Sequence, residues 1–177
     1  MKGVRQHGFT LFELVIVIVI VSVLATVFAR RLTIYQELAE KAAMDATLNI
    51  IKTALQIRLA NLIIDNRQSE TDELERTNPI QWLAEKPSNY IGLYRAPTET
   101  GSWYYDERRL ELVYVPRSAE HLKIEKTGDE REIRFRIRLI IDHLETAGVR
   151  VNSVTGVALI PVRPYRWTPI ITSTLWA

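Results

Sequence analysis

An almost unbroken apolar run near the start of the chain is followed by an amphipathic one. From Phe9 to Ala29 the only ionisable side chain is Glu13, and most of the others are Val, Ile and Leu. At about 1.5 Å of rise per residue, this run predicts a helix of roughly 30 Å, long enough to cross the hydrocarbon core of a bilayer. Further along, apolar residues recur every three or four positions: Leu48, Ile51, Leu55, Leu59 and Leu62. This spacing predicts a helix with one buried face.

The two runs belong to one stretch without helix breakers. Glycine and proline destabilise a helix interior most, and neither occurs between Phe9 and Asn78. We therefore expect a single long helix that ends near Asn66, with its first half in the membrane and its second half packed on a domain. Glu37 and Lys41 lie four residues apart in the favourable order, so we expect them to form a solvated ion pair on this helix.

A connecting region follows the helix. Asn78 and Pro79 are typical of the N-cap and the first position of a helix, which predicts a short helical turn that ends before Pro87. Residues 89–101 are rich in glycine and proline and predict a loop.

The rest of the chain has strand character. Segments 103–105 and 110–115 flank one polar turn, and segments 122–125 and 133–141 flank another, so each pair predicts a β-hairpin. A last strand is expected at 157–162. Strands that follow a long helix predict an α+β fold, in which the helix packs on a small antiparallel sheet.

One predicted strand alternates strictly. Its apolar residues are Ile133, Phe135, Ile137 and Leu139, and its arginines are Arg134, Arg136 and Arg138. Such alternation predicts one packed face and one wet face. The arginine row is the best candidate for a binding surface, since it could contact nucleic-acid phosphates while nearby tyrosines stack on bases. The alternative is a solvated face whose arginines pair with acidic side chains.

The charge balance favours the second interpretation. The chain has 23 basic and 21 acidic residues, and two of the basic ones, Lys2 and Arg5, precede Phe9. Without these two the balance is 21 to 21, which gives no global electrostatic argument for nucleic acid as a partner. The chain has no cysteine, so disulfides and thiolate chemistry are excluded.

The apolar run opens with the motif Gly8-Phe9-Thr10-Leu11-Phe12-Glu13-Leu14-Val15, behind a short basic leader. It resembles the class III signal of type IV prepilins and type II secretion pseudopilins. In that family the leader ends in Gly, and Phe begins an apolar helix with Glu at its fifth position. The resemblance implies that a prepilin peptidase cleaves between Gly8 and Phe9 and methylates the new amine of Phe9. It also implies that Glu13 acts in assembly.

The same resemblance implies a domain organisation and a location. Residues 1–8 are then a leader peptide, residues 9–29 a transmembrane and assembly helix, and residues 30–177 a periplasmic pilin-like domain that includes the amphipathic half of the helix. The protein is expected in the bacterial inner membrane and then in a type IV pilus or a type II secretion pseudopilus. Its implied partners are the prepilin peptidase, other pilin or pseudopilin subunits, the assembly platform and the assembly ATPase.

Two absences distinguish the chain from the major subunits of this family. Many major pilins carry Pro near the membrane exit and a C-terminal disulfide loop, whereas this chain has Arg30-Arg31 and no cysteine. The carboxyl-terminal calcium-binding pattern of the major secretion pseudopilin is not evident either. Segments 78–83 and 101–106 look like those of minor pilins of the mannose-sensitive-haemagglutinin type. We therefore expect a minor pilin or pseudopilin.

Two other interpretations of the N-terminal segment stay open. It could be a secretory signal cut after Ala25 or Ala29, although it is long for a signal and contains an acid. It could also be a single-pass tether for a periplasmic binding module, with DNA as a ligand of the arginine row. The tether and the pilin differ at Glu13, because assembly requires the carboxylate and a tether tolerates Glu13→Leu.

Nothing in the sequence favours an enzyme. Once the leader is removed, the histidines His121 and His143 are far apart and lack metal-ligand spacing. There is no glycine-rich phosphate loop and no nucleophile elbow. We therefore predict no catalytic residue, no metal site and no cofactor.

Overall fold

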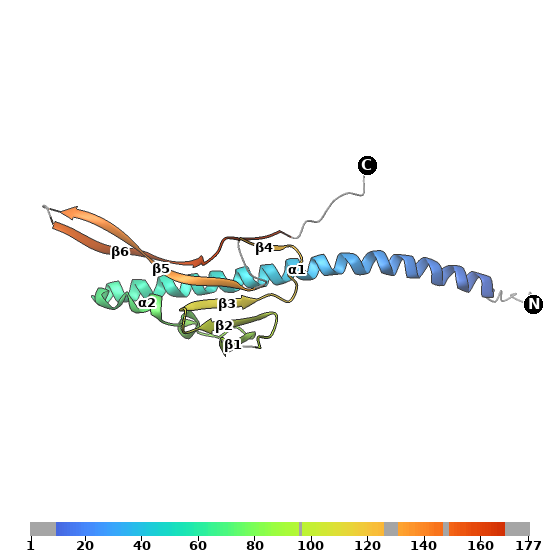
Figure 1. Ribbon diagram of the computed structural model, residues 1–177, viewed down its shortest axis with the longest axis horizontal. Helices are drawn as coiled ribbons and strands as arrows, with labels where there is room; N and C mark the ends of the chain where they lie inside the picture. Colours follow the sequence, from blue (N-terminus) through green and yellow to red (C-terminus); the bar gives the residue numbers. More distant parts are fainter. Residues whose placement is uncertain (1–9, 96, 126–130, 147–148, 169–177) are drawn as a thin grey trace, which may run out of the picture. The chain divides into compact units, whose positions relative to one another are not determined.

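The structure is a computed structural model that describes residues 10–95, 97–125, 131–146 and 149–168 of the chain. It contains two compact units, Met1–Gln36 and Glu37–Ala177. The helix α1 (Leu11–Ile64) contributes residues to both units, which confirms the prediction of a single long helix that ends near Asn66 (Figure 1).

In the first unit, the described residues form the apolar part of α1. Every residue from Thr10 to Ala29 is exposed to solvent. Within the described ranges, α1 is the one helix that is long and apolar enough to cross a membrane. Its length and composition therefore fit the predicted span.

In the second unit, α1 buries one face in the hydrophobic core. The helix residues of this core are Met44, Leu48, Ile51, Leu55, Leu59 and Leu62. All five positions predicted for the buried face are among them, so that prediction is confirmed. Each fully buried side chain of this size contributes about 1.5–3 kcal/mol of hydrophobic stabilisation.

Short helical segments connect α1 to the strands. They are η1 (Gln68–Glu70), α2 (Glu73–Arg76) and the 3-10 helix η2 (Pro79–Trp82). Asn78 caps η2 as predicted, because its side-chain oxygen accepts a 3.1 Å hydrogen bond from the backbone N–H of Ile80. The proline that opens η2 has no N–H group in need of a partner.

A five-stranded sheet packs on the second half of α1 and has the order β1-β2-β3-β5-β6 (Figure 1). Its strands are β1 (Tyr90–Leu93), β2 (Ser102–Asp106), β3 (Glu111–Val115), β5 (Ile133–Thr146) and β6 (Val149–Pro161). The β2–β3 hairpin is confirmed. The α+β fold is confirmed too, with a sheet that is antiparallel except where β1 runs parallel to β2.

Strand β1 lies in a segment for which the sequence predicts a loop. The strand is irregular: Gly92 has a φ of +129°, and the register against β2 shifts between Tyr90 and Gly92. Only glycine adopts such a φ readily. The segment therefore lacks the regular alternation by which a strand is recognised, and pairing with β2 is what makes it one.

The prediction that segments 122–125 and 133–141 form a second hairpin is wrong. Strand β4 (Leu122–Ile124) pairs with β7 (Tyr165–Trp167) in a separate two-stranded sheet, while β5 lies between β3 and β6. A turn signal in the sequence does not say which strands pair. Strand β6 also begins well before the expected start at residue 157, and it forms a long hairpin with β5.

Candidate processing and assembly site

The described part of the chain begins where the motif enters α1. Thr10 is the N-cap: its Oγ1 accepts a 3.2 Å hydrogen bond from the N–H of Glu13, and its carbonyl accepts a 3.1 Å bond from the N–H of Leu14. Thr10 and Glu13 thus have the spacing of a capping box. Because the N–H groups of a first turn carry partial positive charge, a carboxylate is favoured at Glu13. Gly8 and Phe9 lie outside the described residues.

Two hydroxyl side chains within the apolar helix have internal partners. The hydroxyl of Ser22 donates a 2.7 Å hydrogen bond to the carbonyl of Ile18, and the hydroxyl of Thr26 donates a 2.8 Å bond to the carbonyl of Ser22. An unpaired hydroxyl is costly where water is absent. The helix therefore fits apolar surroundings despite these two residues.

In the second unit, a buried carboxylate links α1 to two distant segments. Glu37 is 1% exposed. Its Oε1 accepts hydrogen bonds from the backbone N–H of His121 (3.0 Å) and from Nε1 of Trp167 (2.8 Å), and its Oε2 lies 2.7 Å from Nδ1 of His121. The solvated ion pair expected between Glu37 and Lys41 is wrong, since Lys41 binds Asp45 at 2.7 Å instead.

Its position on α1 explains the burial of Glu37. It lies seven residues before Met44, two helical turns along, and so shares the buried face of the helix. Desolvation by burial acts to raise the pKa of this carboxyl, but the hydrogen bonds from His121 and Trp167 lower it more. The net pKa lies below the ordinary value of 4.5, so Glu37 is a buried, fully bonded carboxylate.

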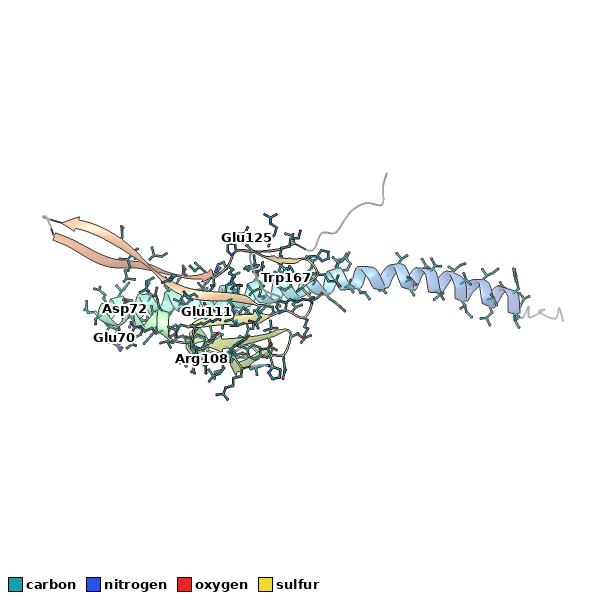
Figure 2. All side chains as sticks on the ribbon, viewed as in Figure 1. Glu70, Asp72, Arg108, Glu111, Glu125 and Trp167 are labelled. Atoms are coloured by element: carbon teal, nitrogen blue, oxygen red, sulfur yellow. The ribbon has the colours of Figure 1, made fainter. Side chains whose placement is uncertain are left out.

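Glu40, one turn further along α1, holds the chain that follows β3. Its Oε1 accepts hydrogen bonds from the hydroxyl of Tyr114 (2.9 Å) and from the N–H of Arg117 (2.7 Å), and its Oε2 accepts one from the N–H of Ser118 (3.2 Å). Burial and the bond to Glu40 raise the pKa of Tyr114. With Trp167, labelled beside α1 in Figure 2, these contacts fix the helix to both sheets.

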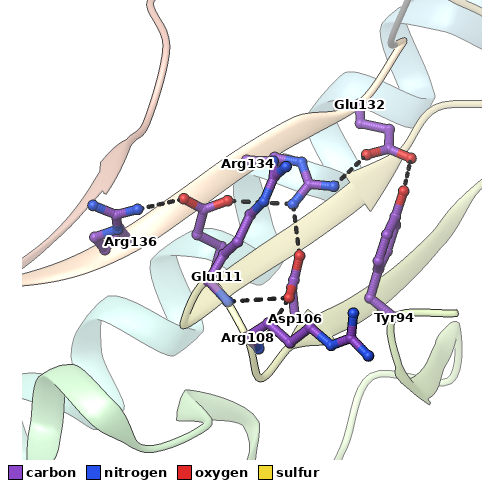
Figure 3. A network of polar contacts seen from close by, with 8 residues as sticks. Tyr94, Asp106, Arg108, Glu111, Glu132, Arg134 and Arg136 are labelled. Carbon is purple, nitrogen blue, oxygen red and sulfur yellow. Dashed lines mark hydrogen bonds and ion pairs between the residues drawn. The ribbon is translucent and has the colours of Figure 1, made fainter.

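Two of the three arginines on β5 lie among carboxylates (Figure 3). Nη1 of Arg134 lies 3.0 Å from Oδ2 of Asp106 and 3.3 Å from Oε2 of Glu111, and its Nη2 lies 2.8 Å from Oε2 of Glu132. Arg136 binds the other oxygen of Glu111 at 2.6 Å. A phosphate would therefore compete with three carboxylates for Arg134.

Tyr94 and the β2–β3 turn complete this network. The hydroxyl of Tyr94 donates a 2.6 Å hydrogen bond to Glu132, and the guanidinium of Arg134 lies 4.8 Å from the centroid of the Tyr94 ring. Asp106 also accepts two 3.1 Å bonds from backbone N–H groups of the turn. Desolvation acts to raise the pKa of Asp106, but the bonds from Arg134 and the turn lower it below its ordinary value.

The three arginines of the row therefore have different surroundings in the structure. The apolar residues Ile133, Phe135 and Ile137 of the same strand are buried, which confirms the packed face. On the other face Arg134 and Arg136 are partly buried in ion pairs, whereas Arg138 is exposed. The pattern of the sequence does not distinguish these three positions, because Asp106 and Glu111, which bind Arg134 and Arg136, come from other strands.

Comparison with known proteins bears on the N-terminal segment. The family model of the prokaryotic N-terminal methylation motif matches residues 4–29. A search of the curated proteins found no match, and neither did a search of the solved structures. The match confirms the resemblance to type IV prepilins and pseudopilins over the residues that carry it. Together, the motif and the apolar helix indicate a membrane-anchored, pilin-like protein that is processed by a prepilin peptidase.

Proposed function

We propose that this protein is a minor pilin or pseudopilin that assembles through its N-terminal helix into a type IV pilus or a type II secretion pseudopilus. The observation that carries the proposal is the methylation motif at residues 4–29, which leads directly into an apolar helix with exposed side chains. In this proposal residues 1–8 are removed, residues 9–29 form the span and assembly helix, and residues 30–177 carry the periplasmic domain.

Glu13 is the proposed assembly residue. A carboxylate in apolar surroundings without a partner costs on the order of a few kcal/mol. The start of its own helix compensates only in part, because the first-turn N–H groups carry partial charges. Cleavage after Gly8 creates an amine on Phe9, and this cation on a neighbouring subunit completes the pair. A wrong stagger between helices leaves Glu13 unpaired, so the pair selects the register of packing.

The transfer of the helix from membrane to fibre fits its surface. Its apolar side chains are exposed from Leu11 to Phe28, and the hydroxyls of Ser22 and Thr26 are bonded to the helix backbone. A fibre core made of such helices resembles the lipid in polarity, so extraction does not oppose the whole hydrophobic effect. In this proposal an assembly ATPase and a platform protein supply the remaining work.

The role of a minor subunit rests on what the sequence lacks. The chain has no cysteine and therefore no disulfide loop of the kind that many major pilins carry. The domain is held instead by its core and by the buried contacts of Glu37 and Arg134.

The experiment that tests this proposal is mass spectrometry of the N-terminus of the membrane-extracted protein, from cells with and without the prepilin peptidase. We expect a methylated Phe9 only when the peptidase is present. An intact leader in both strains would contradict the proposal and favour a plain tether. A terminus at Thr26 or Arg30 would instead show a secretory signal.

A further inference from the structure

Four arginines line a hollow beside the turn between β2 and β3, within the second unit. We call it the arginine hollow. It has a volume of about 600 Å³, and its lining includes Tyr94, Arg95, Asp106, Arg108, Arg109 and Arg134. Glu107 is the other acid among the described residues that line it. A hollow of this size can take several side chains of a partner.

Within the described ranges, three of the four arginines have no carboxylate partner. Arg134 is already bound to three carboxylates. Arg95, Arg108 and Arg109 are exposed, and none of them forms an ion pair with another described residue. Figure 3 shows the contrast: dashed lines meet the guanidinium of Arg134, and none meets that of Arg108. The exposed charges of the described lining are therefore three arginines against Glu107.

Arg163 extends the positive surface beyond the hollow. It is exposed, forms no ion pair with another described residue, and lines a small neighbouring cavity together with Arg109 and Arg134. The acids in the described lining of that cavity, Glu111 and Glu132, are already bound to arginines of β5. Without the leader the chain is neutral, so this surface is a local excess of positive charge. Such an excess attracts a negatively charged partner.

The turn that carries Arg108 and Arg109 is held in place by Asp106. Oδ1 of Asp106 accepts 3.1 Å hydrogen bonds from the backbone N–H groups of both residues, and its Oδ2 lies 3.0 Å from Nη1 of Arg134. Leu110 ends the turn with a φ of +55°, a value that residues other than glycine adopt infrequently. A turn that is already fixed loses little conformational entropy when it binds, which favours affinity.

The chemistry of the hollow suits carboxylates of a protein better than nucleic acid. A guanidinium and a carboxylate form two parallel hydrogen bonds, which makes arginine a preferred partner of carboxylates. Single-stranded nucleic acid also needs aromatic rings on which its bases stack. The guanidinium of Arg134 lies over the ring of Tyr94, 4.8 Å from its centroid, and Tyr105 is only 4% exposed. Neither tyrosine of the described lining therefore offers an open ring.

We propose that the arginine hollow binds an acidic segment of another protein. Asp or Glu side chains of that segment pair with Arg95, Arg108 and Arg109, and the fixed turn presents the last two together. Arg163 lies where a longer acidic segment continues past the hollow. The inference goes beyond the proposed function and does not depend on it, because it concerns the second unit alone.

Fluorescence anisotropy of the full chain in mild detergent tests the proposal, with end-blocked hexaglutamate that carries an uncharged dye as the probe. We expect saturable binding at about 0.1 M salt and no binding of hexaglutamine. Arg108→Gln combined with Arg109→Gln should weaken hexaglutamate binding at least fivefold. The matched control, Lys52→Gln combined with Arg58→Gln, removes the same charge from α1 outside the hollow and should weaken binding less than twofold.

Three results would overturn the proposal. One is the absence of saturable hexaglutamate binding to the wild type. Another is equal weakening by the two double variants, which would reveal general attraction between opposite charges. The third is tighter binding of a thymidine heptamer, whose six phosphates match the charge of hexaglutamate, through the same two arginines. That result would assign the hollow to nucleic acid. Processing and incorporation enter none of these measurements, so a failure here leaves the proposed function intact.

Discussion

Nε1 of Trp167 donates a 2.8 Å hydrogen bond to Oε1 of Glu37, 130 positions earlier in the chain. His121 adds a backbone hydrogen bond and a ring contact to the same carboxylate. Buried polar groups of this kind need partners, so one side chain on α1 fixes two segments that lie far along the sequence. Glu37 is therefore a structural residue of the domain.

Removal of this carboxylate should destabilise the domain. We expect Glu37→Ala to lower the free energy of unfolding by roughly 3 kcal/mol, because it leaves donors of His121 and Trp167 without their acceptor. Urea unfolding of the full chain in mild detergent, followed by tryptophan fluorescence, measures the change. The exposed Glu85→Ala serves as control and should stay within about 0.5 kcal/mol of the wild type. Equal stability of Glu37→Ala and Glu85→Ala would refute this role.

Glu37 should also make stability depend on pH. Its pKa in the folded protein is below the ordinary 4.5, so the unfolded chain binds the proton more readily. The contribution is complete above about pH 4.5 and is lost as the pH falls through the folded-state pKa. We therefore expect the wild type to lose more unfolding free energy than Glu37→Gln between about pH 6 and about pH 3. The same loss in both proteins would assign the acid sensitivity to other carboxyls.

Two arginines on one face of β5 offer a matched comparison. Arg134→Met should lower the free energy of unfolding by about 2–4 kcal/mol, because Asp106, Glu111 and Glu132 lose their shared cation. Arg138→Met removes the same group from an exposed position and should change stability by less than about 0.5 kcal/mol. The urea assay described above measures both variants. Similar values for the two would show that the ion pairs add nothing measurable.

Glu13→Leu should separate processing from assembly. The proposed cleavage between Gly8 and Phe9 does not involve Glu13, so we expect a methylated Phe9 in this variant. Incorporation should fall at least tenfold, since no carboxylate remains to pair with the amine of a neighbour. Immunoblots of sheared fibres and of membranes give the two fractions, with Val15→Leu, two residues further along the helix, as an apolar control. Normal incorporation of Glu13→Leu would leave the segment as a tether only.

Gly8→Leu should instead block removal of the leader peptide, which precedes assembly. A glycine lets the extended backbone approach a protease closely, and a leucine side chain fills that space. We expect an uncut precursor in the inner membrane, detected by its mass, whereas Val4→Leu in the leader should be cleaved normally. Efficient cleavage of Gly8→Leu would contradict the proposal that a prepilin peptidase processes this protein.

Local patterns predicted those parts of the fold that depend on neighbours in sequence. The three- and four-residue spacing from Leu48 to Leu62 correctly predicted the buried face of α1. Asn78 correctly predicted the start of η2. Strand pairing depends on distant segments instead. Strand β4 (Leu122–Ile124) pairs with β7 (Tyr165–Trp167), and no turn signal in the sequence indicates this pairing.

The same limit applies to individual side chains. Glu37 and Lys41 have the spacing of a surface ion pair, but the burial of Glu37 depends on what packs against α1. Arg134 and Arg138 look equivalent in sequence, but Asp106 of β2 and Glu111 of β3 lie beside Arg134. The sequence holds one further local signal, since Thr10 and Glu13 have the spacing of a capping box at the start of α1.

The ion pairs of Arg134 affect the rate at which the domain unfolds. They link the end of β2 and the start of β3 to the start of β5, and Tyr94 after β1 joins them through Glu132, so the complete network forms only when all four segments are in place. Contacts that form after the transition state for folding slow the unfolding rate and leave the folding rate nearly unchanged. In a chain without disulfides, such contacts lengthen the lifetime of the native state.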